Sequence, residues 1–122
     1  MHYIYAHFLG DYIFQSDFMA LNKKKSTPHC LLHVFCYMIP FLFCGFAPWQ
    51  LVLIAVQHYA IDRTNFVLWF MKWKGQETFA TGPCFPWSQI VMDNILHILW
   101  IAFVAYLPEL FVKISLLRMY SV

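Results

Sequence analysis

Charged side chains are scarce in this sequence, and their scarcity excludes an ordinary water-soluble domain. Of 122 residues, only 11% are Asp, Glu, Lys or Arg, whereas soluble domains carry about 25%. A soluble chain of this length would need far more polar surface to cover a single core, so the excess apolar residues must face an apolar environment outside the protein. We therefore expect the lipid bilayer to be a partner of this chain.

A strong net charge and closely paired cysteines are also missing, and we expect no removable leader. The net charge of +2 is too small to indicate nucleic-acid binding. No CxxC pair occurs, so we expect the cysteines to behave as small buried hydrophobic residues. No clean apolar run is followed by a small-residue cleavage site, so a signal peptide is not expected. The four cysteines are Cys30, Cys36, Cys44 and Cys84.

What the sequence does contain is 61% hydrophobic and 20% aromatic residues, gathered into long segments. Four segments of about 20 residues could each cross a hydrocarbon core of about 30 Å as a helix. Proline, glycine and lysine mark the breaks between them. We predict an all-α, polytopic membrane bundle that forms one domain over residues 1–122. The predicted transmembrane helices cover approximately 2–21, 29–47, 49–71 and 87–108, and a short interfacial helix follows over 109–122.

Basic residues cluster between these segments, at Lys23, Lys24 and Lys25 and again at Lys72 and Lys74. Such clusters are typical of membrane-edge anchors, and the positive-inside rule places both on the same side of the membrane. Segments one and three would then run inward, and segment four would run back.

Histidines and acids are paired at one recurring spacing. Three of the six acidic residues stand four positions from a histidine, although random placement predicts only about 0.6 such pairs at the spacing that shares a helix face. With the predicted topology, each pair places its histidine toward the outer side and its aspartate toward the inner side. The three pairs are His7 with Asp11, His58 with Asp62, and Asp93 with His97.

Ionisable groups inside a membrane are costly, so these pairs should face the bundle and share partners. A divalent cation would satisfy several of them together, because its charge offsets the mutual repulsion of the carboxylates. Mixed His and Asp ligation suits zinc, manganese or iron, and such an ion can activate water to attack an ester or phosphoester. We expect His7, Asp11, His58, Asp62, Asp93 and His97 to bind the metal, with catalytic roles for Asp11, Asp62 and Asp93.

Two other interpretations remain open from the residues alone. The pairs could form a metal-free polar network that sets the register of the helices. They could also line a proton or ion path, as in a transporter.

Four further residues are candidate substrate contacts or supports of the metal ligands. Gln15 and His33 could border the aspartate end of the cluster. Arg63 either extends its charge to the interface or contacts an anionic lipid or substrate head group. Asn65, three residues after Asp62, either donates to a ligand or makes a helix contact.

The same motifs resemble a family of small membrane proteins of unknown function from bacteria and their phages. The resemblance rests on an H-x3-D-x3-Q motif from His7 to Gln15, then Leu32-His33-Val34 with Tyr37, then H-x3-D at His58 and D-x3-H at Asp93. It covers about residues 5 to 100, and the chain departs from the pattern at Asn65 and Asn94. Members are distantly similar to membrane-bound metal-dependent hydrolases. The resemblance implies a location in the bacterial inner membrane.

These observations lead to two functional hypotheses. The first is a membrane-embedded, metal-dependent hydrolase of a lipid-linked or membrane-proximal ester or phosphoester. The second is a non-enzymatic membrane protein, either an ion or small-solute conduit or a structural partner in a homo-oligomer or larger membrane complex.

Overall fold

The computed structural model describes residues 2–120, and within that range the chain is all-α with no strand. This confirms the predicted all-α class. In chain order the elements are α1 (His2–Phe8), a π-helical turn η1 (Leu9–Ile13), α2 (Asp17–Asn22), α3 (Thr27–Met38), a 3₁₀ turn η2 (Pro40–Phe43), α4 (Pro48–Arg63), α5 (Phe66–Trp73), α6 (Glu77–Thr81) and α7 (Trp87–Tyr120).

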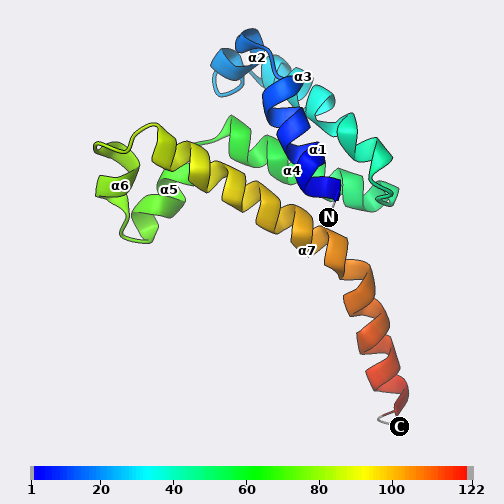
Figure 1. Cartoon of the computed structure of the whole chain (residues 1–122). Helices are drawn as coiled ribbons and strands as arrows, with labels where there is room; N and C mark the ends of the chain where they lie inside the picture. Colours follow the sequence, from blue (N-terminus) through cyan, green and yellow to red (C-terminus); the bar gives the residue numbers. More distant parts are fainter. Residues whose placement is uncertain (1, 121–122) are drawn as a thin grey trace.

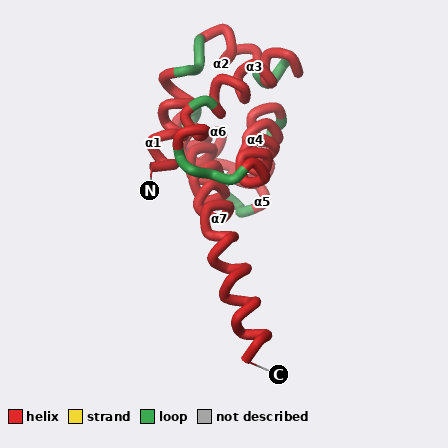
Figure 2. Tube along the Cα trace, turned by 90° about the vertical axis from the view of Figure 1, so that its right-hand side faces the viewer, coloured by secondary structure: helices red, strands yellow, loops and turns green. Residues whose placement is uncertain are grey.

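Helices α1, α3, α4 and α7 form the bundle, and α5 and α6 make a small hairpin beside one end of α7 (Figure 1). The second view shows the C-terminal part of α7 projecting away from the other helices (Figure 2). The larger hydrophobic core lies inside the bundle and includes Tyr37, Phe41, Ile54 and Ile101. A smaller core under the hairpin contains Val67 and is otherwise formed by Ile61, Met71 and Ala80.

The prediction of four transmembrane helices is not supported. Among the described residues, one stretch, Trp87–Met119, is long and apolar enough to cross a membrane by length and composition. Only 17% of its most apolar window is buried by the rest of the chain. This burial is low for a core helix of a soluble domain, so the stretch is consistent with a membrane anchor.

Local side-chain chemistry explains why the other predicted segments are broken. The first is divided by η1 and by Ser16, whose hydroxyl caps α2 by accepting from the Met19 amide. The second breaks at Pro40, which cannot donate a backbone hydrogen bond. The third predicted segment breaks where α4 ends, at Arg63. There the hydroxyl of Thr64 donates to the Ala60 carbonyl and the backbone becomes extended.

The fourth segment is longer than predicted, because α7 continues through Pro108. Proline has no amide hydrogen to donate to the carbonyl four residues earlier, that of Val104. The side chain of Gln50 on α4 donates to this carbonyl instead, at 2.8 Å. The interfacial helix predicted for 109–122 is therefore the end of α7, and residues 121 and 122 lie outside the described residues.

Candidate metal centre

Each of the four bundle helices contributes one fully buried histidine to the space between them. His7 comes from α1, His33 from α3, His58 from α4 and His97 from α7, and each is 0% exposed. Burying four imidazoles in an otherwise apolar bundle is costly unless they find partners. Three aspartates lie close to these histidines, and the aspartates and three of the histidines together form two groups of potential metal ligands.

The first group, which we name the inner group, consists of Asp11, His33, His58 and Asp62, all buried. The Nε2 atoms of the two histidines lie 2.9 Å apart. The Oδ2 atom of Asp62 lies 2.8 Å from His33 Nε2 and 3.2 Å from His58 Nε2. The Oδ1 atom of Asp11 lies 3.3 and 3.4 Å from the same two nitrogens.

These separations have the size expected around one metal ion. Four ligands about 2.0 Å from a tetrahedral ion lie about 3.3 Å from one another. Hydrogen bonding alone serves the cluster poorly, because each Nε2 carries at most one proton and is close to three other polar atoms. Asp11 Oδ1 has no hydrogen-bond partner in the described structure. The inner group therefore could hold a metal ion.

The second group, which we name the outer group, consists of Asp11, Asp93 and His97. His97 Nε2 lies 3.7 Å from Asp93 Oδ2 and also 3.7 Å from Asp62 Oδ1. Asp11 belongs to both groups. The three aspartates predicted to converge from three helical segments therefore do lie together.

His7 occupies a different position from the other three histidines. Its Nε2 lies 3.0 Å from Asn94 Oδ1 and its Nδ1 lies 2.9 Å from the Tyr37 hydroxyl. Asn94 Nδ2 donates to the hydroxyl of Tyr12, which assigns Oδ1 as the atom that faces His7. His7 then donates from Nε2 and accepts at Nδ1, so both of its nitrogens are used. The structure places it beside Asp11, at 3.6 Å, but in neither ligand group.

Tyr37 is central to this region, although the sequence predicted no site role for it. Its ring stacks on that of His58, with centroids 3.5 Å apart and an interplanar angle of 10°. Its spacing of four residues from His33, which places both on one face of α3, was the available signal. Gly10 allows the close approach of η1 to this ring, because a Cβ atom there would lie 2.6 Å from Tyr37 Cδ2.

Lys23 also lies at the centre, although it was predicted to be a membrane-edge anchor. Its Nζ donates to Asp62 Oδ2 at 2.9 Å. Burial opposes the charge of the ammonium group, but the carboxylates of Asp62 and Asp11 outweigh this effect and raise the pKa of Lys23 above its ordinary value. The raised pKa favours the charged form of this lysine beside the inner group.

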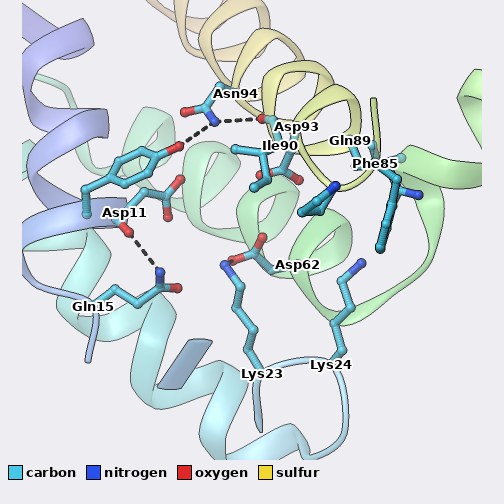
Figure 3. Close-up of a pocket in the computed structure, with 13 residues that line it drawn as sticks. Asp11, Gln15, Lys23, Lys24, Asp62, Phe85, Gln89, Ile90, Asp93 and Asn94 are labelled. Atoms are coloured by element: carbon cyan, nitrogen blue, oxygen red, sulfur yellow. Dashed lines mark hydrogen bonds and ion pairs between the residues drawn. The ribbon is translucent and has the colours of Figure 1, made fainter. Parts of the chain in front are cut away.

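A cavity of about 290 Å³ opens next to the two groups. Figure 3 shows the carboxylates of Asp62 and Asp93 with Lys23 and Lys24 around it. Asp11 and Asp62 of the inner group line this cavity, whereas His33 and His58 do not and lie behind its wall. Phe85, Pro86 and Ile90 supply an apolar side to it.

Of the other predicted residues Gln15, Arg63 and Asn65, Gln15 alone lines this cavity. Gln15 lines it and donates to the backbone carbonyl of Asp11 at 2.9 Å. Arg63 donates to the backbone carbonyl of Lys24 at 2.7 Å, so it anchors the lysine turn. Asn65 is exposed and precedes α5, and the structure does not bring it to the cavity.

Comparison with known proteins places the chain in a family but not in a functional class. The model of the family described as "Protein of unknown function (DUF3307)" matches residues 1–120, so the chain belongs to that family. No curated protein and no solved structure matches the chain.

Proposed function

We propose that this member of a family of unknown function is an integral membrane, metal-dependent hydrolase that cleaves a lipid-linked or membrane-proximal ester or phosphoester. The inner group carries this proposal. The distance between its two imidazole nitrogens and the four distances from these nitrogens to its two carboxylate oxygens are all 2.8 to 3.4 Å. It lies beside an open cavity rather than in a sealed core.

The ligand chemistry favours a borderline divalent cation. Two imidazoles and two carboxylates suit zinc, manganese or iron. Such an ion supplies Lewis acidity, which polarises an ester and makes water a usable nucleophile near neutral pH. Asp62 Oδ2 has lone pairs for both an ion and the hydrogen bond from Lys23. Lys23 therefore does not exclude a cation from this position.

The charges around the cavity favour an anionic substrate once a cation is bound. Three carboxylates and two lysines line it, so its formal charge is −1. One divalent cation changes this charge to +1, and Lys23 and Lys24 can then approach a phosphate oxygen. Without the cation, the carboxylates would repel a phosphoester. Metal and substrate binding are thus expected to be coupled.

The membrane part of the proposal is supported by apolar surface as well as by α7. Phe35 on α3 is 70% exposed, Phe43 on η2 is 86% exposed, and Val56 on α4 is 61% exposed. Such a broad apolar surface is unusual on a soluble monomer. We propose that α3 and α4 lie in the bilayer beside α7, with the Lys23–Lys25 turn at its edge. The motif resemblance supports the bacterial inner membrane as its location.

Metal analysis of the full chain, purified in detergent, tests the proposal. We expect at least about one equivalent of zinc, manganese or iron, and loss of that metal in Asp62→Asn, since the asparagine amide is a much weaker ligand. Asp17→Asn is the matched control, because Asp17 is an exposed acid in the first turn of α2. Less than about 0.2 equivalents in every preparation would refute the metal site.

A second measurement tests catalysis. The metal-loaded protein in lipid nanodiscs should hydrolyse an aryl phosphodiester, an aryl phosphomonoester or an aryl ester, and Asp62→Asn should lower turnover at least about 100-fold. Bound metal without turnover of any of these probes would favour the non-enzymatic alternative, an ion conduit or a subunit of a membrane complex.

A further inference from the structure

His97 has a buried ring nitrogen that lies outside the inner group. The residue is 0% exposed, and its Nε2 has no hydrogen-bond partner in the described structure. Its other nitrogen, Nδ1, lies 3.1 Å from Gln57 Oε1. Because an amide oxygen only accepts, the tautomer of the neutral imidazole that fits this contact has its proton on Nδ1 and a free lone pair on Nε2. This arrangement, with one nitrogen bonded to a support and the other bare, is typical of a metal-ligating histidine.

The bare nitrogen faces two carboxylates at a spacing that suits a shared ion. His97 Nε2 lies 3.7 Å from Asp62 Oδ1 and 3.7 Å from Asp93 Oδ2. Both distances are too long for a hydrogen bond. Two ligands that each lie about 2.1 Å from one ion are separated by about 3.0 to 4.2 Å, depending on the angle between them. Asp11 completes the outer group.

Asp62 connects the two groups through its two oxygens. Its Oδ2 faces the inner histidines, at 2.8 and 3.2 Å, whereas its Oδ1 faces His97. Asp11 is likewise a member of both groups. Carboxylates that present oxygens to two neighbouring positions are suited to bridge two cations, and paired ions of this kind act together in many hydrolytic enzymes.

We propose that the outer group binds a second divalent cation, so that the centre is binuclear, with Asp11 and Asp62 shared between the two ions. The inner ion is held by His33 and His58, and the outer ion by Asp93 and His97. This inference rests on the metal site of the proposed function and extends it.

The second ion also narrows the substrate class. Asp93 lines the cavity and its side chain is 26% exposed, whereas the inner histidines are fully buried. The outer ion is therefore the one that a substrate oxygen meets. Two divalent cations change the formal charge around the cavity from −1 to +3, which favours a phosphoester over a neutral ester.

Counting bound manganese tests this inference. The full chain is purified in detergent, stripped with a chelator and reloaded with Mn²⁺ alone. We expect about two equivalents in the native protein and in Asp17→Asn, and about one in Asp93→Asn and in His97→Gln. The bound manganese in the native protein should give the electron paramagnetic resonance spectrum of a coupled pair, because bridged ions lie only about 4 Å apart. This spectrum requires no variant, so a folding defect cannot hide the answer.

The outcomes separate the two proposals. One equivalent in the native protein, with the spectrum of an isolated ion and no change in His97→Gln, would overturn the binuclear centre and leave the single-metal hydrolase intact. No bound manganese would overturn the second site. Two coupled ions without hydrolysis of any phosphoester probe would support the binuclear centre and count against the hydrolase. Among active preparations, the native protein should prefer the aryl phosphodiester to the aryl ester, and His97→Gln should lose that preference.

Discussion

The phenol ring of Tyr37 lies parallel to the imidazole of His58, with ring centroids 3.5 Å apart, and its hydroxyl reaches His7 Nδ1 at 2.9 Å. The Nδ1 atom of His58 has no hydrogen-bond partner in the described structure. Metal-ligating histidines usually gain their orientation from a hydrogen bond at the second nitrogen. For His58 the stacked ring of Tyr37 provides the orientation instead. One residue of α3 therefore positions histidines on both α4 and α1.

Replacing Tyr37 separates stacking from hydrogen bonding. Tyr37→Phe keeps the ring and loses only the contact with His7, so we expect metal affinity within about threefold of the native value. Tyr37→Leu removes the stacked ring and should weaken metal binding about 10- to 100-fold, as loss of an orienting support does at other metal sites. Titration of each metal-stripped variant with Mn²⁺ measures its metal affinity. Equal affinities in the two variants would show that stacking does not position His58.

Gly10→Ala tests the close approach of η1 to α3. The added Cβ would lie 2.6 Å from Tyr37 Cδ2 and 2.9 Å from the Tyr37 carbonyl oxygen, so the two elements must separate. We expect a loss of about 1 to 3 kcal/mol in the free energy of unfolding, together with weaker metal binding, because Asp11 follows directly. Thermal unfolding in detergent and a Mn²⁺ titration give the two values.

The comparison variant for that experiment is Gly75→Ala. Gly75 has a φ of +77°, and a Cβ atom added there would have no neighbouring atom within 4 Å, so alanine meets strain but no clash. It should cost about 1 to 2 kcal/mol and leave metal affinity unchanged. If both variants lose metal affinity equally, the effect of Gly10→Ala reflects general instability rather than the position of Asp11.

Lys23→Met is expected to have opposite effects on the metal-free and metal-bound protein. Without metal, the buried Asp62 carboxylate loses its ammonium partner, which should lower the free energy of unfolding by about 2 kcal/mol. With metal, a cation that repels the ion is removed, so Mn²⁺ affinity should rise about tenfold. Lys25→Met, in the same turn but exposed, is the control for both measurements. A fall in metal affinity in Lys23→Met would mean that the lysine supports the ion rather than repels it.

Arg63→Ala distinguishes the two roles considered for this residue. In the structure its guanidinium donates to the Lys24 carbonyl at 2.7 Å and to the Thr27 hydroxyl at 3.4 Å, so it anchors the lysine turn to the end of α4. We expect KM for a phosphodiester to rise about fivefold while kcat stays nearly constant, because Lys24 is less well placed. Arg63→Lys should not restore KM, since lysine lacks the planar fork. Full rescue by lysine would instead indicate a simple contact with an anionic head group.

Spacing along the chain was sufficient to find many of the residues at this centre. Asp11, His58, Asp62, Asp93 and His97 were selected because histidine and aspartate four positions apart share a helix face, and the structure places each of them in at least one of the two groups. The all-α class was equally accessible, since long apolar segments with few charges are unlike any strand pattern. Both conclusions depend on local periodicity, which the order of residues contains directly.

The positions at which these helices break depend on weaker local signals. Thr64 ends α4 through one hydrogen bond to the Ala60 carbonyl, and η1 adds a π-helical turn around Asp11. Neither feature interrupts the apolar pattern of the sequence. Conversely, the fourth span was predicted to end near residue 108, but Gln50, which is 54 positions away from Val104 in the chain, donates a hydrogen bond to the carbonyl that Pro108 leaves free.

Only the tertiary structure decided which histidines face the ligand groups and which cation accompanies them. His33 has no acid four positions away, yet packing of α3 against α4 brings its Nε2 to 2.9 Å from His58. His7 has the paired spacing, yet Tyr37 and Asn94 occupy both of its nitrogens. Lys23 turns inward to Asp62 from a position that resembles a membrane edge. Spacing along one helix specifies a shared face, whereas the partner of that face is set by contacts between segments far apart in the chain.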